Sequence, residues 1–331
     1  MSDAILQVSN LEKHFRVGRG KILRAVDNVS FAIQRGKTLG LVGESGCGKT
    51  TVGRTLLRIY EPDGGTIVFD GQDISKVTRA QAKALTRKMQ MIYQDPYGCF
   101  DSRMPGINQV AEPLVVHRGL SKEDALKEAA KVLKAVGMPE HHMTRLPATM
   151  SGGQLQRAAI ARAVALRPAL LACDEPVASL DVSIQAQVLE LLLRLKRATR
   201  MSMLFVSHNL NVVRYLCDRV TVMYLGRIVE TGKTDDVFHR PLHPYTRLLL
   251  ASTPGADASV VRFYPKGAMP SPIDRPEGCV FAYRCPRATD RCSREVPELT
   301  DVKEEERRIA CWASENALKS LGKMEETECS R

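Results

Sequence analysis

The chain has 331 residues, 44% apolar and 26% charged, which is the composition of a folded globular protein. It has no run near the ~20 apolar residues of a membrane-spanning helix and no visible signal peptide, so we expect a cytoplasmic protein rather than an integral membrane or secreted one. The net charge of +11 favours anionic partners such as nucleotides, nucleic acid or acidic lipids, or is simply a solvated basic surface.

The first third of the chain predicts strands around a glycine-rich turn. Residues 26–33 alternate apolar and polar side chains, as a half-buried strand does. Residues 38–42 form a short apolar run, which is typical of a buried parallel strand, and helical spacing follows over residues 51–60. The remaining strands expected here lie at residues 5–8, 66–69 and 89–93.

The segment of about residues 96–167 predicts helices, with Ser121 suited to cap one of them. Strands and helices then alternate, which predicts an α/β fold with a parallel core sheet covered by helices and with the helical segment inserted into it. We expect a nucleotide-binding domain over residues 1–252 and a small extension, rich in Pro, Gly and Cys, over residues 253–331. The later elements are expected as strands at 170–173, 203–207 and 219–223 and helices at 183–199 and 210–217.

The turn after residues 38–42 reads GESGCGKT, which fits the P-loop pattern GxxxxGK[ST] in full. Its glycines let backbone N–H groups face a bound phosphate, and the N-terminus of the following helix favours the anion. Lys49 supplies a positive charge to the β- and γ-phosphates, and Thr50 can offer its hydroxyl to Mg²⁺. We expect ATP to contact Gly43, Glu44, Ser45, Gly46, Cys47, Gly48, Lys49, Thr50 and Thr51.

Two carboxylates, Asp174 and Glu175, directly follow the strand expected at residues 170–173. At the end of a parallel strand Asp174 is placed to hold Mg²⁺, and Glu175 can orient or deprotonate the attacking water. An acidic pair after a strand is also common in ordinary loops, but together with the P-loop it predicts ATP hydrolysis.

Residues 151–154 read SGGQ and precede the helix expected over residues 155–167. At this point the sequence resembles the ABC transporter ATPases, whose signature motif it matches, although alone it could be an ordinary helix cap. The resemblance implies that Ser151 and Gly153 contact the γ-phosphate bound by a partner subunit's P-loop. By the same resemblance, two ATPase chains would meet head to tail. The resemblance also implies a P-loop NTPase fold, with a parallel core sheet, an antiparallel β subdomain and a helical subdomain.

The same resemblance assigns further residues. Gln94 is similar to the Q-loop glutamine, which senses Mg²⁺ and water, and Asp181 lies in an ASLD sequence similar to the D-loop. His208 resembles the switch histidine, which contacts the γ-phosphate. Phe15 stands where the family has an aromatic that stacks on adenine, unless it belongs to the core. The expected catalytic set is Lys49, Gln94, Glu175 and His208, and the expected Mg²⁺ ligands are Thr50, Gln94 and Asp174.

Within the family, three sequences are similar to the ATPases of dipeptide and oligopeptide importers and their nickel and glutathione relatives: CDEPV at 173–177, DVSIQAQ at 181–187 and PLHPYT at 241–246. The start of the chain resembles the second of the two ATPases of such systems. This implies a sister ATPase, two transmembrane permeases and an extracytoplasmic substrate-binding protein, at the cytoplasmic face of the membrane. Residues 97–105 would dock the permease or form an ordinary surface loop.

Four cysteines crowd into the extension: Cys279, Cys285, Cys292 and Cys311. Their spacing matches neither the ferredoxin patterns nor the close CxxC pairs of structural zinc sites. Some importers of this group carry a four-iron, four-sulfur cluster here. The cysteines could hold such a [4Fe–4S] cluster, bind zinc or simply be buried thiols, and the sequence leaves all three open.

Two other functional classes are alternatives to an importer ATPase. A soluble ABC protein acting on nucleic acid or ribosomes would carry two cassettes or a long coiled-coil insertion. This chain has one set of motifs and a short helical stretch between Gln94 and Ser151. An interaction module with an inactive site conflicts with the intact Lys49, Asp174 and Glu175. We therefore expect an ATPase that drives import, most simply of peptides and otherwise of nickel or glutathione, and no nucleic-acid partner.

Overall fold

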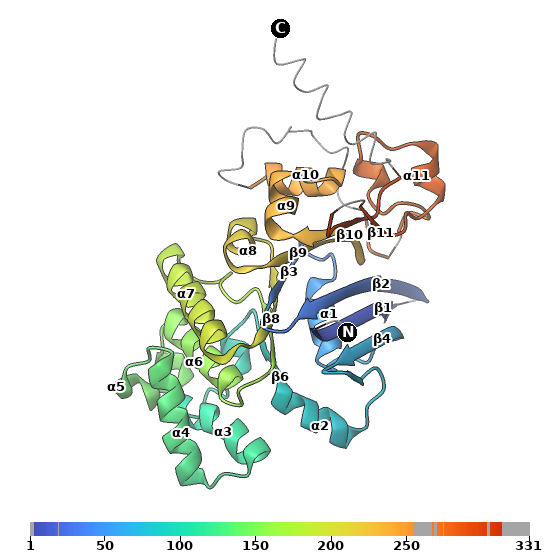
Figure 1. Cartoon of the computed structure of the whole chain (residues 1–331). Helices are drawn as coiled ribbons and strands as arrows, with labels where there is room; N and C mark the ends of the chain where they lie inside the picture. Colours follow the sequence, from blue (N-terminus) through green and yellow to red (C-terminus); the bar gives the residue numbers. More distant parts are fainter. Residues whose placement is uncertain are drawn as a thin grey trace.

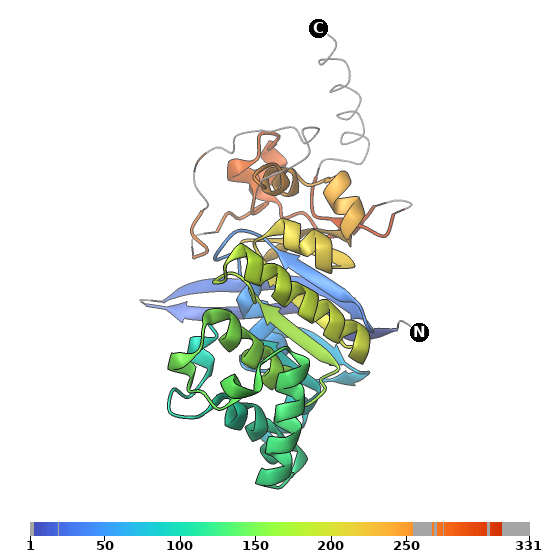
Figure 2. The same cartoon turned by 90° about the vertical axis from the view of Figure 1, so that its left-hand side faces the viewer.

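The computed structural model describes residues 3–18, 20–253, 267, 270–273, 275–302 and 305–312. Within them the chain forms an eight-stranded mixed sheet and a four-stranded antiparallel sheet. A helical segment lies at one end of the molecule and the C-terminal part at the other, with the two sheets between them (Figures 1 and 2). The predicted α/β fold is confirmed, and no described helix is long and apolar enough to cross a bilayer.

The main sheet has a parallel core in which β3 (Thr38–Val42), the strand before the P-loop, pairs with a neighbour on each side. All five residues of β3 are buried, because helices and the second sheet cover both faces. Carboxyl ends of parallel strands meet at one edge, so the segments that follow them are brought together there. The other parallel strands are β6 (Met89–Ile92), β7 (Leu170–Asp174), β8 (Ser202–Ser207) and β9 (Arg219–Tyr224).

The second sheet contains β1 (Ala4–Val17), β2 (Lys21–Gln34), β4 (Gly64–Phe69) and β5 (Gln72–Asp73). β1 is longer than the predicted strand at residues 5–8, because it pairs with β2 down to the hairpin pair Val17 and Lys21. The helix after the P-loop, α1 (Lys49–Leu56), lies between the two sheets (Figure 1). Its Val52 joins Leu41 of β3 and Ile67 of β4 in one buried cluster.

The helical segment contains α3 (Gly106–Arg118), α4 (Lys122–Ala135), α5 (Glu140–Met143) and α6 (Gly152–Val164), with the short turns η1 (Tyr97–Cys99) and η2 (Pro147–Thr149). The predicted cap is confirmed: Ser121 Oγ accepts the Asp124 N–H at 3.1 Å at the start of α4. One helix of the first third was not predicted, α2 (Arg79–Lys88), which begins with a capping box between Thr78 and Gln81.

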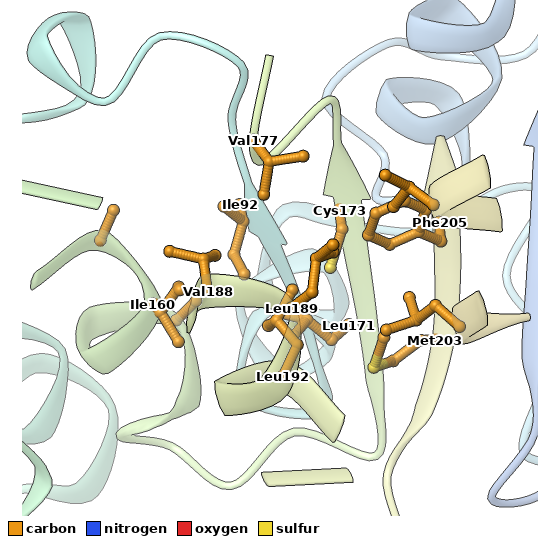
Figure 3. Packing of buried hydrophobic residues seen from close by; sticks show 14 of the residues in the cluster. Ile92, Ile160, Leu171, Cys173, Val177, Val188, Leu189, Leu192, Met203 and Phe205 are labelled. Atoms are coloured by element: carbon orange, nitrogen blue, oxygen red, sulfur yellow. The ribbon is translucent and has the colours of Figure 1, made fainter. Parts of the chain in front are cut away.

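A large buried cluster joins the main sheet to the helices. Figure 3 shows Leu171 and Cys173 of β7 next to Met203 and Phe205 of β8, facing apolar side chains of α6 and of α7 (Val182–Thr199). Burial raises the pKa of the Cys173 thiol far above its ordinary value, so this cysteine acts as a small apolar core residue. The packing fixes the strand whose end carries the two predicted carboxylates.

The C-terminal part begins with α8 (Leu210–Leu216), β10 (Arg227–Lys233), α9 (Thr234–His239) and α10 (Pro244–Ala251). The extension adds η3 (Ala282–Arg284), α11 (Asp290–Arg294), β11 (Thr300–Asp301) and β12 (Arg308–Ile309). β12 pairs antiparallel with β10, so the extension continues the main sheet instead of forming a separate body. Much of the range 253–331 lies outside the described residues, and a domain boundary near 252 stays a prediction.

A buried ion pair holds the extension on the sheet. Arg307, just before β12, bonds to Glu230 of β10, and both side chains are fully buried. Glu230 also accepts the backbone N–H groups of Leu242 at 3.1 Å and His243 at 2.9 Å. A buried carboxylate needs such a full set of donors, since an unpaired charge in the interior is strongly destabilising. β10, the PLHPYT segment and the extension therefore form one hydrogen-bonded unit.

Candidate nucleotide-binding site

The P-loop is the turn between β3 and α1, and its glycines are required by close contacts. Gly48 has a φ of 106°, and a Cβ atom there would lie 2.0 Å from the Ala25 carbonyl oxygen. A Cβ atom on Gly43 would lie 2.1 Å from the Met223 carbonyl oxygen. Neither position can hold another residue without moving backbone. β2 and β9 thus enclose the loop from behind, while Ser45 and Gly46 are exposed at its tip.

Lys49 folds back over the loop that precedes it. Its side chain is almost fully buried, and Nζ donates to the carbonyl oxygens of Gly43 at 2.8 Å and Glu44 at 2.9 Å. Cys47 is buried beside it, with Sγ 3.7 Å from Nζ, and burial raises the pKa of this thiol. The ammonium is therefore held at the centre of the loop, where it can exchange a neutral acceptor for a phosphate oxygen.

Thr50 and Asp174 meet across the end of β7. Thr50 Oγ1 donates to Asp174 Oδ1 at 2.9 Å, and Asp174 is only 1% exposed. Burial raises the pKa of the Asp174 carboxyl, and the hydrogen bond from Thr50 lowers it in part. A buried carboxylate beside a hydroxyl supplies the oxygen ligands that Mg²⁺ prefers. The residues present thus fit the ion that the sequence predicts. Thr51 follows in the first turn of α1, where its carbonyl accepts the Thr55 hydroxyl.

Glu175 connects two other predicted residues. Its Oε2 accepts the Gln94 Nε2–H at 3.2 Å and lies 3.1 Å from His208 Nδ1. The Glu175 backbone has a φ of 46°, and its N–H donates to the Val206 carbonyl at 3.0 Å. These side chains follow β6, β7 and β8 respectively, so three separate strands place them together at the sheet edge. The arrangement can hold a carboxylate in position to accept a proton.

Phe15 lies near the end of β1 and is half-buried. Its ring packs edge-on against Tyr60, with 5.4 Å between the centroids, and Lys13 Nζ lies 5.4 Å from the Phe15 centroid. Tyr60 in turn accepts a hydrogen bond from Arg54 of α1. Phe15 is therefore linked to the helix that follows the P-loop, and its stacking on adenine stays a prediction.

The signature and D-loop residues contact each other's helices. Ser151 begins α6 with a capping box formed with Gln154. A Cβ atom on Gly153 would lie 2.9 Å from Ile184 of α7, so this glycine allows the two helices to approach. Asp181 precedes α7, and its exposed side chain makes no cap hydrogen bond. In the part of the chain that the structure describes, the hydrogen bonds and close contacts of these residues lie within α6 and α7 and do not involve the P-loop of the same chain.

Sequence reasoning missed the side chains that surround Glu44. The Glu44 N–H donates to Tyr245 Oη at 2.8 Å, and Arg284 Nη1 donates to both Glu44 carboxylate oxygens at 2.9 and 3.1 Å. Arg284 also donates to Tyr224 Oη at 3.3 Å. Tyr245 lies in the PLHPYT segment and Arg284 next to Cys285. The PLHPYT segment and the cysteines carry the family resemblance, but nothing local in the sequence indicates that either segment contacts the P-loop.

The four cysteines of the extension lie near one another, but within the described residues they are not arranged as metal ligands. Cys279 belongs to the main core cluster, with Cys285 and Cys292 packed against it. Burial raises the pKa of Cys279 to about 12, and the charges of the other three cysteines raise it further. Among the described residues, no group of three or more His, Cys, Asp or Glu is arranged to hold a metal ion. The [4Fe–4S] cluster, one of the three alternatives, therefore lacks structural support, and the structure places Cys279 as a buried thiol and Cys285 as a half-buried one.

Comparison with curated proteins decides the family. The chain is 43% identical to the di/tripeptide transport ATP-binding protein DppF of Pseudomonas aeruginosa over 96% of this chain and 99% of that protein. The chain belongs to the ATP-binding subunits of ABC transporters. This ATPase is also 42% identical to the putative oligopeptide transport ATP-binding protein YkfD of Bacillus subtilis, over 95% and 96% of the two chains.

Two family descriptions and the solved structures agree with this assignment. "ABC transporter" matches residues 26–178, and "Oligopeptide/dipeptide transporter, C-terminal region" matches residues 229–292. The dimeric cassette MJ0796 bound to ADP and Pi superposes with a TM-score of 0.64 at 27% identity, over 69% of this chain and 98% of that one. CbiO1 of Clostridium perfringens gives 0.63 at 28% identity, over 72% and 92%. The predicted family and its ATPase activity are confirmed.

Proposed function

We propose that this ABC ATPase hydrolyses ATP to power the import of dipeptides or oligopeptides. The observation that carries the enzymatic part is the meeting of Lys49, the Thr50–Asp174 pair and Glu175 at one edge of the main sheet. The peptide cargo rests on the similarity to di/tripeptide and oligopeptide transport ATP-binding proteins and on the match to the C-terminal region of oligopeptide/dipeptide transporters.

In the proposed reaction, Lys49 and the backbone amides of residues 43–51 bind the triphosphate. Thr50 and Asp174, with Gln94, would hold Mg²⁺, which neutralises charge on the β- and γ-phosphates when bound. Glu175 orients a water molecule toward the γ-phosphorus and accepts its proton on the carboxylate. Gln94 and His208 keep that carboxylate in position, and His208 can also donate to the γ-phosphate.

We also propose that Ser151, Gly153 and Asp181 complete the nucleotide site of a second ATPase subunit. Support comes from the position of Ser151 and Gly153 at the start of α6, beside α7, from the exposed Asp181 side chain just before α7, and from the dimeric form in which MJ0796 was solved. The second subunit would be a sister ATPase. Two membrane permeases and an extracytoplasmic binding protein would complete the importer, with this chain on the cytoplasmic face. Tyr97 of η1, which is 53% exposed, suits a docking surface for a permease.

The test of the enzymatic part is Glu175→Gln. Gln is nearly isosteric and can still accept from Gln94, so ATP binding should persist while turnover falls by about 10²- to 10⁴-fold. Turnover is measured as phosphate release by the assembled importer in proteoliposomes, and binding with a fluorescent ATP analogue. Glu190→Gln, an exposed position on α7, is the matched control and should behave like wild type. Turnover of Glu175→Gln near the wild-type rate would refute the assignment of the base.

The cargo needs a separate measurement. The binding protein that co-purifies with the importer should carry a short peptide, identified by mass spectrometry, and ATP-dependent uptake in proteoliposomes should follow that peptide. Uptake of nickel or glutathione with no uptake of peptides would leave the ATPase assignment in place and refute the proposed cargo.

A further inference from the structure

The C-terminal extension contacts the P-loop, because Arg284 of the extension bonds to Glu44. Glu44 is the second residue of the GESGCGKT sequence. Its backbone N–H donates to the Tyr245 hydroxyl at 2.8 Å, and its carboxylate receives two hydrogen bonds from Arg284 Nη1 at 2.9 and 3.1 Å. Arg284 lies 240 positions further along the chain, in η3. A region without any predicted catalytic residue therefore contacts the phosphate-binding loop directly.

The Arg284–Glu44 contact is largely buried, unlike an ordinary surface ion pair. Arg284 is 8% exposed, and its guanidinium lies 5.8 Å from the Tyr224 ring centroid and 5.9 Å from that of Phe281. The rings of Tyr224, Tyr245 and Phe281 also pack on one another. Burial opposes the charge of the guanidinium, but hydrogen bonds to Glu44 and Tyr224 raise the pKa of Arg284. Because the guanidinium is buried, this pair is screened by solvent less than a surface ion pair.

Charge explains what the pair can do. A P-loop gathers backbone N–H groups and one lysine around a triphosphate, and a carboxylate in that loop repels the same ligand. The Glu44 side chain is 30% exposed, and its carboxylate forms an ion pair with Arg284. Arg284 neutralises the negative charge of Glu44 and holds its carboxylate on the side of the extension.

We propose that Arg284 is a positioning residue through which the extension sets the affinity of the P-loop for ATP, by neutralising Glu44. The proposal rests on the ATP-binding role argued above and adds a regulatory role for the extension. Because the extension is attached to β10 through the Arg307–Glu230 pair, a displacement of the extension would leave Glu44 uncompensated and weaken ATP binding. The nucleotide site thereby becomes sensitive to whatever contacts the extension.

The test is a double-mutant cycle on ATP affinity in the full-length chain. Arg284→Met should raise the Kd for Mg-ATP about five- to tenfold, with a larger effect on ATP than on ADP and at low salt. Adding Glu44→Gln to Arg284→Met should restore the Kd to within about twofold of wild type, because the repulsive charge is gone. Arg291→Met, which removes an exposed arginine of the same extension, is the matched control and should not change the Kd.

Three outcomes decide the proposal. An unchanged Kd in Arg284→Met with only a lower Tm would overturn it, since the pair would then be a structural brace. Failure of Glu44→Gln to restore affinity would overturn it too, because charge would not be the cause. If Arg284→Met does not fold, Arg284→Lys is measured in its place. Lys keeps the positive charge, so the Kd of Arg284→Lys should stay near the wild-type value, and a tenfold higher Kd for this variant would overturn the proposal. Wild-type protein that does not bind ATP at all would instead refute the proposed function.

Discussion

His243 should lower the free energy of unfolding in mild acid, because its side chain is buried as a neutral imidazole. The side chain is 1% exposed, Nδ1 accepts the Tyr245 N–H at 3.1 Å as the cap of α10, and the ring contacts Phe281. Burial lowers the pKa of His243 to about 3. The folded protein therefore keeps this imidazole neutral, whereas the unfolded chain takes up a proton near the ordinary pKa of about 6.5.

The sign and size of the effect follow from that difference. Above pH 6.5 both states are neutral at this position, and the free energy of unfolding does not depend on it. Between pH 6.5 and about 3 only the unfolded state binds the proton, so stability falls as the pH falls. One pKa unit corresponds to about 1.4 kcal/mol, so the loss reaches about 2 kcal/mol at pH 5.

The variant His243→Asn separates this effect from all other titrations. Asn is a good helix cap and does not titrate, and the volume that it removes changes stability equally at every pH. Urea unfolding of both proteins at pH 7.5, 6.5, 5.5 and 5.0 should show the stability difference shifting by about 2 kcal/mol in favour of the variant. His239→Asn, at an exposed position on α9, should show no such shift. A stability difference that stays constant over this range would refute the reasoning.

Three further variants test other parts of the structure. Lys49→Ala should weaken Mg-ATP binding at least about tenfold by calorimetry, because a charge-assisted hydrogen bond to phosphate is lost, and unchanged affinity would remove the P-loop assignment. Arg307→Met leaves the buried Glu230 carboxylate unpaired and should lower the free energy of unfolding by about 3–5 kcal/mol, and a loss under 1 kcal/mol in urea would contradict the buried pair. The raised pKa of Asp174 means that the ionised carboxylate destabilises the folded protein at neutral pH. Asp174→Asn should therefore raise the Tm of the nucleotide-free protein. The same variant should abolish the further rise in Tm that Mg-ATP gives the wild type. A lower nucleotide-free Tm would show that the carboxylate is stabilised by partners other than Thr50.

The catalytic elements were readable from the sequence because their signals are local. The P-loop needs glycines at fixed positions beside a lysine, and Asp174 and Glu175 directly follow an apolar run. Strand–helix alternation then predicts that such segments meet at one sheet edge, which the contacts of Glu175 with Gln94 and His208 show in three dimensions. α2 was missed because its exposed, polar sequence carries no apolar periodicity and only its capping box marks it.

By itself the sequence determined the class of fold and the family, and it named the residues expected to bind the phosphates, since each signal depends on neighbours within about ten positions. Only the tertiary structure decided that β12 extends the main sheet, that Cys279, Cys285 and Cys292 pack in or against the main core cluster, and that Arg284 pairs with Glu44. The physical reason is that these contacts join residues 77 to 240 positions apart, or depend on how deeply a thiol is buried. Neither a long-range pairing nor a degree of burial leaves a periodic or spaced pattern in the chain.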